Sequence, residues 1–185
     1  MLKNLRLILV LLLICGIMYP LAMTGISQVI FPAKADGSVI EDEDGNVVGS
    51  ELIGQSFKNP KYFTGRVSSI EYNASGSGSG NYAPSNEDMI KRTTSDIKAF
   101  LEKNPDVQTE DIPADLLTNS GSGLDPHISP LAAKIQVPRI ADVRGISEER
   151  LESLIEENTE ARQYGVLGES RVNVLQLNME LDRLK

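Results

Sequence analysis

The chain has 185 residues, which is room for one ordinary domain and excludes a large multidomain enzyme. It carries 18 Lys and Arg against 26 Asp and Glu, a formal charge of −8, and the N-terminal cations Lys3 and Arg6 precede every acidic residue. A chain this acidic offers no basic surface to bind a phosphate backbone, so nucleic-acid binding is disfavoured. One cysteine, Cys15, and one histidine, His127, exclude an internal disulfide and a Cys/His zinc site.

The first predicted element is a transmembrane helix over residues 7–31. This stretch contains no charged residue, and about 20 apolar residues suffice to cross the hydrocarbon core of a bilayer. Pro20 is its one helix breaker, so a kink is expected near Tyr19. The positive charge on the short side predicts that residues 1–6 stay in the cytoplasm and that the acidic remainder lies outside it.

Two alternatives compete with a retained anchor. A cleaved signal peptide needs a small-x-small site, and Ala33-Lys34-Ala35 fits, but the apolar run exceeds the roughly 7–15 residues typical of such peptides. Lipidation at Cys15 is disfavoured because Ile14 precedes it, where a lipoprotein signal requires a small residue. A single-pass anchor in the cell membrane is therefore preferred, with residues 32–185 as the extracytoplasmic soluble domain.

A β-hairpin is predicted after the membrane segment. Residues 39–40 and 47–48 are β-branched pairs that flank an Asp-Gly turn signal, which predicts two short strands. The segment also partly matches a calcium-binding loop. Its candidate ligands are Asp42, Asp44 and Glu51. Because Ile40 occupies the first ligand position and no flanking helices are predicted, a calcium module is the lowest-ranked alternative.

The soluble part is predicted to be a single α+β domain with several loops. Residues 75–80 read Ser-Gly-Ser-Gly-Ser-Gly, which predicts a flexible loop. No Lys-Ser or Lys-Thr follows it, so it does not match a phosphate-binding loop.

Two helices and a strand are predicted in the second half. A helix is predicted from Asn86, because Ser85 or Asn86 can cap it and acidic residues suit its first turn, and Pro105 is expected to stop it. A second helix is predicted from Ser147 to about Gly165, because a hydrophobic staple and an apolar stripe follow Ser147. The tail from Arg171 is predicted to be a strand that leads into a short helix.

Glycine, proline and hydrogen-bonding residues crowd residues 118–130, which is typical of a tightly built loop. Asp125 and His127 stand one residue apart among serines, so one alternative is a membrane-anchored hydrolase with a Ser/His/Asp arrangement. Its candidate nucleophiles are Ser120, Ser122 and Ser129. A structural or interface role is favoured, because no Gly-x-Ser-x-Gly elbow occurs and Pro126 indicates turn building.

The same loop, read with residues 136–145, resembles the signature of the C subunit of Kdp-type potassium-transporting ATPases almost residue for residue. The signature positions are Ser120, Gly121, Ser122, Gly123, Asp125, Pro126, His127, Ser129, Gln136, Arg139 and Arg144. Shorter matches run from residues 19–21 in the anchor to 172–175 in the tail, so the resemblance spans the chain. Val67 and Ala83 depart from the proline and glycine usual there, which concerns local turns only.

The resemblance implies an accessory, non-catalytic subunit of a high-affinity, ATP-driven potassium uptake complex, needed for its assembly and stability. The implied partners are a channel-like potassium-binding subunit and the ATP-hydrolysing P-type subunit. ATP, Mg²⁺ and K⁺ would belong to the complex, and this chain would hold no metal or cofactor of its own.

Family members are also described as catalytic chaperones that raise the ATP affinity of the hydrolysing subunit. With the domain outside the cytoplasm, that effect would have to be allosteric. Small residues in the anchor are expected to allow close packing on the channel-like partner. The residues at this expected contact are Gly16, Pro20, Ala22 and Gly25.

Overall fold

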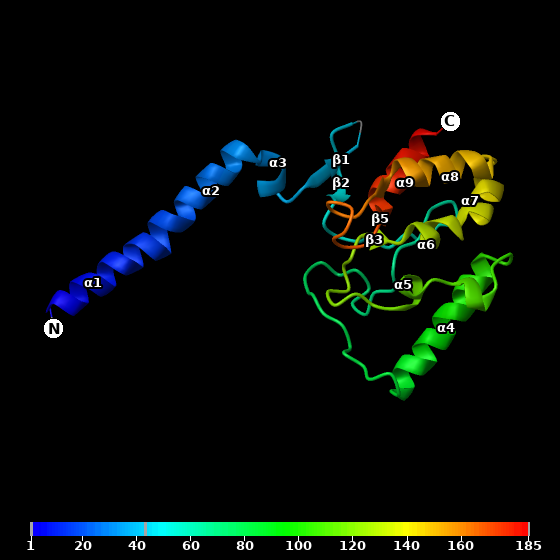
Figure 1. The fold of residues 1–185 in the computed structure, drawn as a ribbon, viewed down its shortest axis with the longest axis horizontal. Helices are drawn as coiled ribbons and strands as arrows, with labels where there is room; N and C mark the ends of the chain where they lie inside the picture. Colours follow the sequence, from blue (N-terminus) through cyan, green and yellow to red (C-terminus); the bar gives the residue numbers. More distant parts are fainter. Residues whose placement is uncertain (1, 43, 185) are drawn as a thin grey trace. The chain divides into compact units, whose positions relative to one another are not determined.

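The computed structural model describes residues 2–42 and 44–184. The chain divides into two compact units, Met1–Ser50 and Glu51–Lys185. In the first unit, α1 (Leu2–Leu13) and α2 (Tyr19–Ile30) are joined by a π-helical turn, Ile14–Met18 (Figure 1). Together they form one uninterrupted helix.

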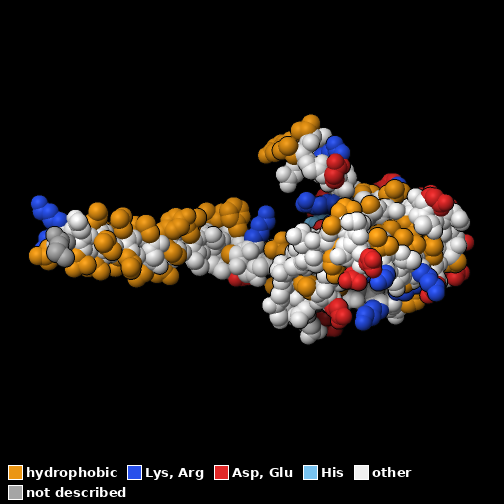
Figure 2. Space-filling view, turned by 90° about the horizontal axis from the view of Figure 1, so that it is seen from below, with side chains coloured by type: hydrophobic (Ala, Val, Ile, Leu, Met, Phe, Trp, Pro, Cys, Tyr) orange, Lys and Arg blue, Asp and Glu red, His pale blue; other side chains and the backbone are white. Residues whose placement is uncertain are grey.

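This helix is long and apolar enough to cross a membrane, and its apolar window has no side chain buried within the protein. Figure 2 shows hydrophobic side chains along its length and basic ones only near its two ends. It begins earlier than the predicted residues 7–31 and ends at Ile30. Phe31 leaves the helical conformation (φ −135°, ψ 58°) because a residue before proline avoids it, and Pro32 then starts α3 (Pro32–Ala35).

The predicted hairpin is confirmed. β1 (Val39–Glu41) and β2 (Val47–Ser50) pair antiparallel. The Asp42 carboxylate, a candidate calcium ligand above, accepts hydrogen bonds from the backbone N–H groups of Asp44 at 3.0 Å and Asn46 at 2.8 Å. It therefore builds the turn between the strands.

The second unit combines helices with a small antiparallel sheet. Its helices are α4 (Glu87–Lys103), α5 (Ala114–Leu117), α6 (Pro130–Lys134), α7 (Val137–Arg144), α8 (Glu148–Glu157) and α9 (Val174–Arg183), with a 3-10 turn at Thr109–Asp111. Its strands, in the order β3-β5-β4, are β3 (His127–Ile128), β5 (Arg171–Asn173) and β4 (Thr159–Glu160). The predicted class, one membrane-length helix followed by an α+β domain, is confirmed.

Local signals located most of these elements correctly. The Asn86 side chain caps α4 by accepting from the N–H groups of Asp88 and Met89, both at 3.0 Å, and the helix ends before Pro105 as predicted. The predicted passage from strand to helix in the tail is β5 followed by α9.

The predicted end of the second helix is wrong. The side chain of Ser147 caps α8 as expected, but α8 stops at Glu157 and does not reach Gly165. Thr159 instead enters β4 and lies opposite Val172 of β5. A β-branched residue gains more from the sheet than from another turn of helix, and the sequence around Thr159 gives no sign of that distant pairing.

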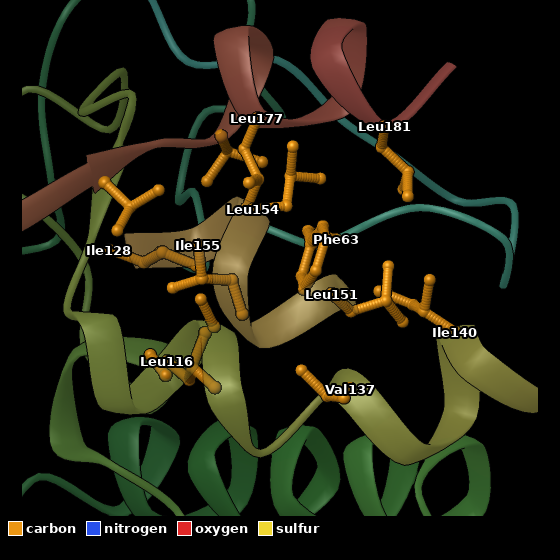
Figure 3. Close-up of a cluster of buried hydrophobic side chains, with 14 of the residues drawn as sticks. Phe63, Leu116, Ile128, Val137, Ile140, Leu151, Leu154, Ile155, Leu177 and Leu181 are labelled. Atoms are coloured by element: carbon orange, nitrogen blue, oxygen red, sulfur yellow. The ribbon is translucent and has the colours of Figure 1, made fainter. Parts of the chain in front are cut away.

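The core of the second unit lies among α6, α7, α8 and α9 (Figure 3). Leu177 and Leu181 of α9 point towards Leu151 and Leu154 of α8, in the same cluster as Phe63. Further labelled members of this cluster are Leu116, Ile128, Val137, Ile140 and Ile155.

Phe63 belongs to residues 51–86, which contain no helix or strand, yet its side chain is fully buried. The side-chain amide of the buried Asn178 makes the pair of backbone hydrogen bonds that a neighbouring strand would otherwise supply. Its oxygen accepts from the Phe63 N–H and its nitrogen donates to the Phe63 carbonyl, each at 2.9 Å. This satisfies the backbone of an irregular segment that crosses the core.

Candidate functional site

The signature loop, residues 118–130, runs from α5 through β3 to the start of α6, and its serines build turns. Ser120 Oγ accepts from the N–H of Gly123 at 2.9 Å, and Ser122 Oγ accepts from that of Leu124 at 3.0 Å. Gly123 has a left-handed backbone (φ 71°), and a Cβ there would lie 2.9 Å from the Gly78 carbonyl oxygen. Glycine is therefore required at 123.

The predicted flexible loop, residues 75–80, touches the signature loop. The Gly78 N–H donates to the Ser122 carbonyl at 2.8 Å. Gly121 has open space around it, so no close contact requires a glycine there. At the other end, the Pro126 carbonyl accepts from the Val174 N–H at 3.0 Å, which ties the signature loop to the start of α9.

Asp125 is the electrostatic centre of this loop. One of its carboxylate oxygens accepts from the His127 N–H at 3.0 Å and lies 3.3 Å from His127 Nδ1. The other oxygen accepts from Arg66 at 2.9 Å. Partial burial raises the pKa of Asp125, but the hydrogen bonds from His127 and Arg66 outweigh it and bring the pKa to about 2. The carboxylate is therefore held charged.

Residues of the irregular segment enclose Asp125. Tyr72 donates its hydroxyl proton to the Arg66 carbonyl, and burial together with the nearby Asp125 charge raises the pKa of Tyr72. The Gly54 N–H donates to the Leu124 carbonyl at 2.7 Å, and a Cβ at Gly54 would lie only 2.6 Å from the Asp125 carbonyl oxygen. Gly54, Arg66 and Tyr72 are not among the site residues predicted from the sequence, and no local pattern around them indicates this role.

The Ser/His/Asp alternative can be tested on this geometry. A cleft of about 520 Å³ lies beside Asp125 and His127, so solvent access is present. A nucleophile would have to lie about 2.6–3.2 Å from the imidazole. Within the described part of the chain, the imidazole's hydrogen-bond partner is Asp125, and no serine hydroxyl bonds to it. The geometry gives the hydrolase alternative no support.

Ser129, the third candidate nucleophile, has a different task. Its hydroxyl donates to the Asp115 carboxylate at 3.2 Å and accepts from the Ala132 N–H at 3.1 Å, and its own N–H donates to Asp115 at 2.7 Å. It is the N-cap of α6. No group of three His, Cys, Asp or Glu side chains placed to hold a metal occurs in residues 2–42 and 44–184.

Gln136 and Arg139 lie apart from the signature loop, at the junction of α6 and α7. The fully buried Gln136 exchanges hydrogen bonds with the backbone of Thr64 at 2.9 and 3.2 Å. Arg139 donates to Gln136 at 2.9 Å, to Asn104 at 2.8 Å and to the carbonyls of Pro60 and Tyr62. Burial lowers the pKa of Arg139 to about 10. Both side chains fasten the irregular segment to the helices.

Arg144 forms a third contact of the same kind. It donates to the Lys61 carbonyl at 2.8 Å and to Asp182 at 2.6 Å, and its guanidinium lies 5.0 Å from the centre of the Tyr62 ring. Burial raises the pKa of Asp182, but hydrogen bonds from Arg144 and Tyr62 outweigh it and lower the pKa. The structure therefore gathers residues 120–129 into one loop. The other three signature residues, Gln136, Arg139 and Arg144, lie apart from it and bind the irregular segment.

The predicted packing residues of the anchor all lie in the long helix. Gly16 is in the π-helical turn, and the Tyr19 N–H at the end of that turn donates to the Ile14 carbonyl. This π turn ends at Met18, two residues before Pro20, which lacks an N–H. The kink expected near Tyr19 stays a prediction. Ala22 and Gly25 follow on α2 and are exposed, and a Cβ at Gly16 or Gly25 would meet nothing within 4 Å.

Comparisons with known proteins extend over both units. The family described as K+-transporting ATPase, c chain (KdpC) matches residues 1–183. The chain is 54% identical over 173 residues to the potassium-transporting ATPase KdpC subunit of Bacillus cereus (strain Q1), covering 94% of this chain and 90% of that protein. It is 52% identical over the same shares to the KdpC subunit of Bacillus anthracis (strain CDC 684 / NRRL 3495). The chain therefore belongs to the KdpC family, the c chains of K+-transporting ATPases.

Proposed function

We propose that this chain, as a KdpC-family subunit of a potassium-transporting ATPase, is an accessory, non-catalytic subunit that stabilises the assembled pump. The observation that carries the proposal is the helix Leu2–Ile30, whose apolar side chains are buried nowhere within the protein. A helix that is apolar on all sides is stable only in lipid or against other apolar helices. This chain therefore acts from within the membrane, beside other subunits.

The anchor offers a face for close helix packing. Ala22 and Gly25 stand three residues apart on α2 and therefore share one face, where a partner's backbone can approach, whereas Gly16 lies on a different face. In lipid, such close approach is the main source of helix association. The partner assigned to this face is the channel-like potassium-binding subunit, and the P-type subunit that hydrolyses ATP completes the complex.

The domain is assigned to the outer side of the cell membrane. Lys3 and Arg6 keep the short N-terminus in the cytoplasm by the positive-inside rule. ATP, Mg²⁺ and K⁺ are then bound by the partner subunits. This chain raises the ATP affinity of the hydrolysing subunit through conformational coupling, without contacting ATP itself. The signature residues support a non-catalytic role, because their side chains are engaged in holding the domain together.

The direct experiment removes residues 1–33 and measures co-purification with the two partner subunits from detergent-solubilised membranes. Loss of both partners is expected, because the packing helix is gone. A second variant, Ala22→Leu with Gly25→Leu, keeps the membrane span but fills the packing face. It should reach the membrane and still lose the partners. Retention of both partners by the truncated chain would refute assembly through the anchor.

The effect on ATP has its own measurement. Adding the purified chain to the remaining subunits in vesicles should lower the KM for ATP, whereas calorimetric titration of the chain alone with ATP should show no binding. Heat of binding from the chain alone would overturn the allosteric assignment. Protease treatment of intact cells checks orientation: the domain should be digested, and a protected domain would contradict an outer location.

A further inference from the structure

The connection between β4 and β5 is an ordered hairpin that stands free of the core (Figure 1, the orange loop beside β5). We call residues 161–170 the tip hairpin. Gln163 and Leu167 exchange two backbone hydrogen bonds, each of 2.9 Å, and Arg162 pairs with Glu169 below them. Residues 161–169 are nevertheless all exposed. Backbone hydrogen bonds and one exposed ion pair, and not burial in the core, therefore shape this segment.

The tip itself is apolar. The side chains of Tyr164, Val166 and Leu167 are 93%, 73% and 57% exposed. Tyr164 also has a left-handed backbone (φ 53°), a conformation that a bulky residue adopts only at a cost, and Gly165 follows with φ 76°. Within the described chain, no burial of the Tyr164 side chain offsets that cost.

An exposed apolar tip on a hairpin with little support from the core is typical of a surface that contacts another molecule. A two-stranded hairpin is marginally stable by itself in water, and exposed apolar side chains presented together mark a contact surface. Tyrosine is the residue type most often found, with tryptophan and arginine, at energetically dominant contact positions. We propose that the tip hairpin inserts Tyr164, Val166 and Leu167 into an apolar pocket on another subunit of the potassium pump. This inference rests on the proposed function.

The charges around the tip favour a protein pocket over lipid. Arg162 is paired with Glu169, and Arg171 with Glu160, so the base of the hairpin has no net positive charge to attract anionic headgroups. A second copy of this chain is disfavoured as well, because each copy carries −8. An uncharged, apolar surface of a different subunit fits the tip.

The experiment compares complexes that contain the full-length chain with Tyr164→Ala and Leu167→Ala, singly and together. Dissociation of the chain from the detergent-solubilised pump is measured after dilution. Each single variant should dissociate roughly tenfold faster and the double variant more than thirtyfold, because loss of a dominant contact residue costs at least that much. The matched control is Ile90→Ala on α4, also an exposed apolar residue, which should leave dissociation unchanged.

The readouts separate the possible failures. Thermal unfolding of each purified variant should match the unsubstituted chain, because these side chains are exposed; a lowered melting temperature would make the tip part of the fold and overturn the inference. Unchanged dissociation of the double variant would overturn it too, while the proposed function would stand. If the substitutions speed dissociation of the chain in lipid vesicles but not in detergent, the tip contacts lipid and the inference is wrong. Failure of the unsubstituted chain to co-purify would instead refute the proposed function, and the inference with it.

Discussion

The two units of this protein deal with their apolar side chains in opposite ways. In the first unit, residues of α1 and α2 such as Leu9 stay exposed along the entire helix. In the second unit, Leu177 of α9 and Phe63 are completely buried. The apolar side chains of the first unit are thus left for its surroundings to cover, whereas those of the second unit are covered by its own fold. A substitution in the first unit should therefore affect assembly, and truncation of a buried side chain in the second should affect folding.

The largest expected effect comes from Leu177→Ala. Its side chain is 0% exposed at the centre of the core, so truncation removes buried surface and leaves a cavity. The free energy of unfolding of the second unit should fall by about 2–5 kcal/mol. Urea denaturation of the full chain in detergent, followed by circular dichroism, measures this change.

Leu9→Ala in the anchor is the matched control, because it removes the same atoms from a side chain that is 57% exposed. It should leave the urea midpoint of the second unit unchanged. If Leu9→Ala destabilised the second unit as much as Leu177→Ala, the proposed division of roles between the units would be wrong.

Two glycines sharpen the comparison. Gly54→Ala would place a Cβ 2.6 Å from the Asp125 carbonyl oxygen, and backbone on both sides must shift. The expected loss is about 1–3 kcal/mol in the free energy of unfolding, measured as above. Gly121→Ala, in the signature loop, meets nothing within 4 Å and should change stability by less than about 0.5 kcal/mol.

A third contrast concerns charge. The second unit holds Asp125 ionised with a pKa of about 2, against an ordinary value of 3.8. Since the folded-state pKa is lowered, the resulting stability is present above pH 3.8 and is lost as the pH falls through 2. Relative to Asp125→Asn, the unsubstituted chain should be more stable by about 2 kcal/mol near neutral pH, and most of this advantage should be lost between pH 3.8 and pH 2.

Denaturant unfolding at a series of pH values between 2 and 6 gives this difference directly. Arg66→Met serves as its companion variant. Without the guanidinium that bonds Asp125, the pH range of the loss should move upward. A difference between the unsubstituted chain and Asp125→Asn that stays constant from pH 6 to pH 2 would show that the charge of Asp125 contributes nothing.

Elements with local causes were predicted well. The hairpin of β1 and β2, the cap at Asn86 and the start of α8 after Ser147 depend on residues within a few positions of one another. The end of α8 was not predictable in this way, because Thr159 is taken into a strand by Val172, which lies on another segment. The tip hairpin was missed for a different reason, because Gly165 was interpreted as the end of a helix and lies instead in the turn of the hairpin.

The same difference between local and distant contacts explains how much of the candidate site was predicted. The pattern around Asp125 and His127 marked the correct loop, and the family resemblance selected its residues. His127, two positions away, makes the largest hydrogen-bond contribution to the low pKa of Asp125 and was already visible in the sequence. Arg66, which lowers this pKa further, and Tyr72, which helps to enclose Asp125, lie more than fifty positions earlier in the chain, in a segment without regular structure. No periodicity or spacing connects such residues before the chain is folded.

The sequence by itself determined the membrane-length helix and the class of the domain. An uncharged apolar run and local capping signals need no distant contact to be effective. The family followed from the residues of the signature loop. Only the tertiary structure decided that Gln136 binds the backbone of Thr64 and that Asn178 stands in for a strand beside Phe63. Hydrogen bonds between segments far apart in the chain exist only after hydrophobic burial has brought those segments together.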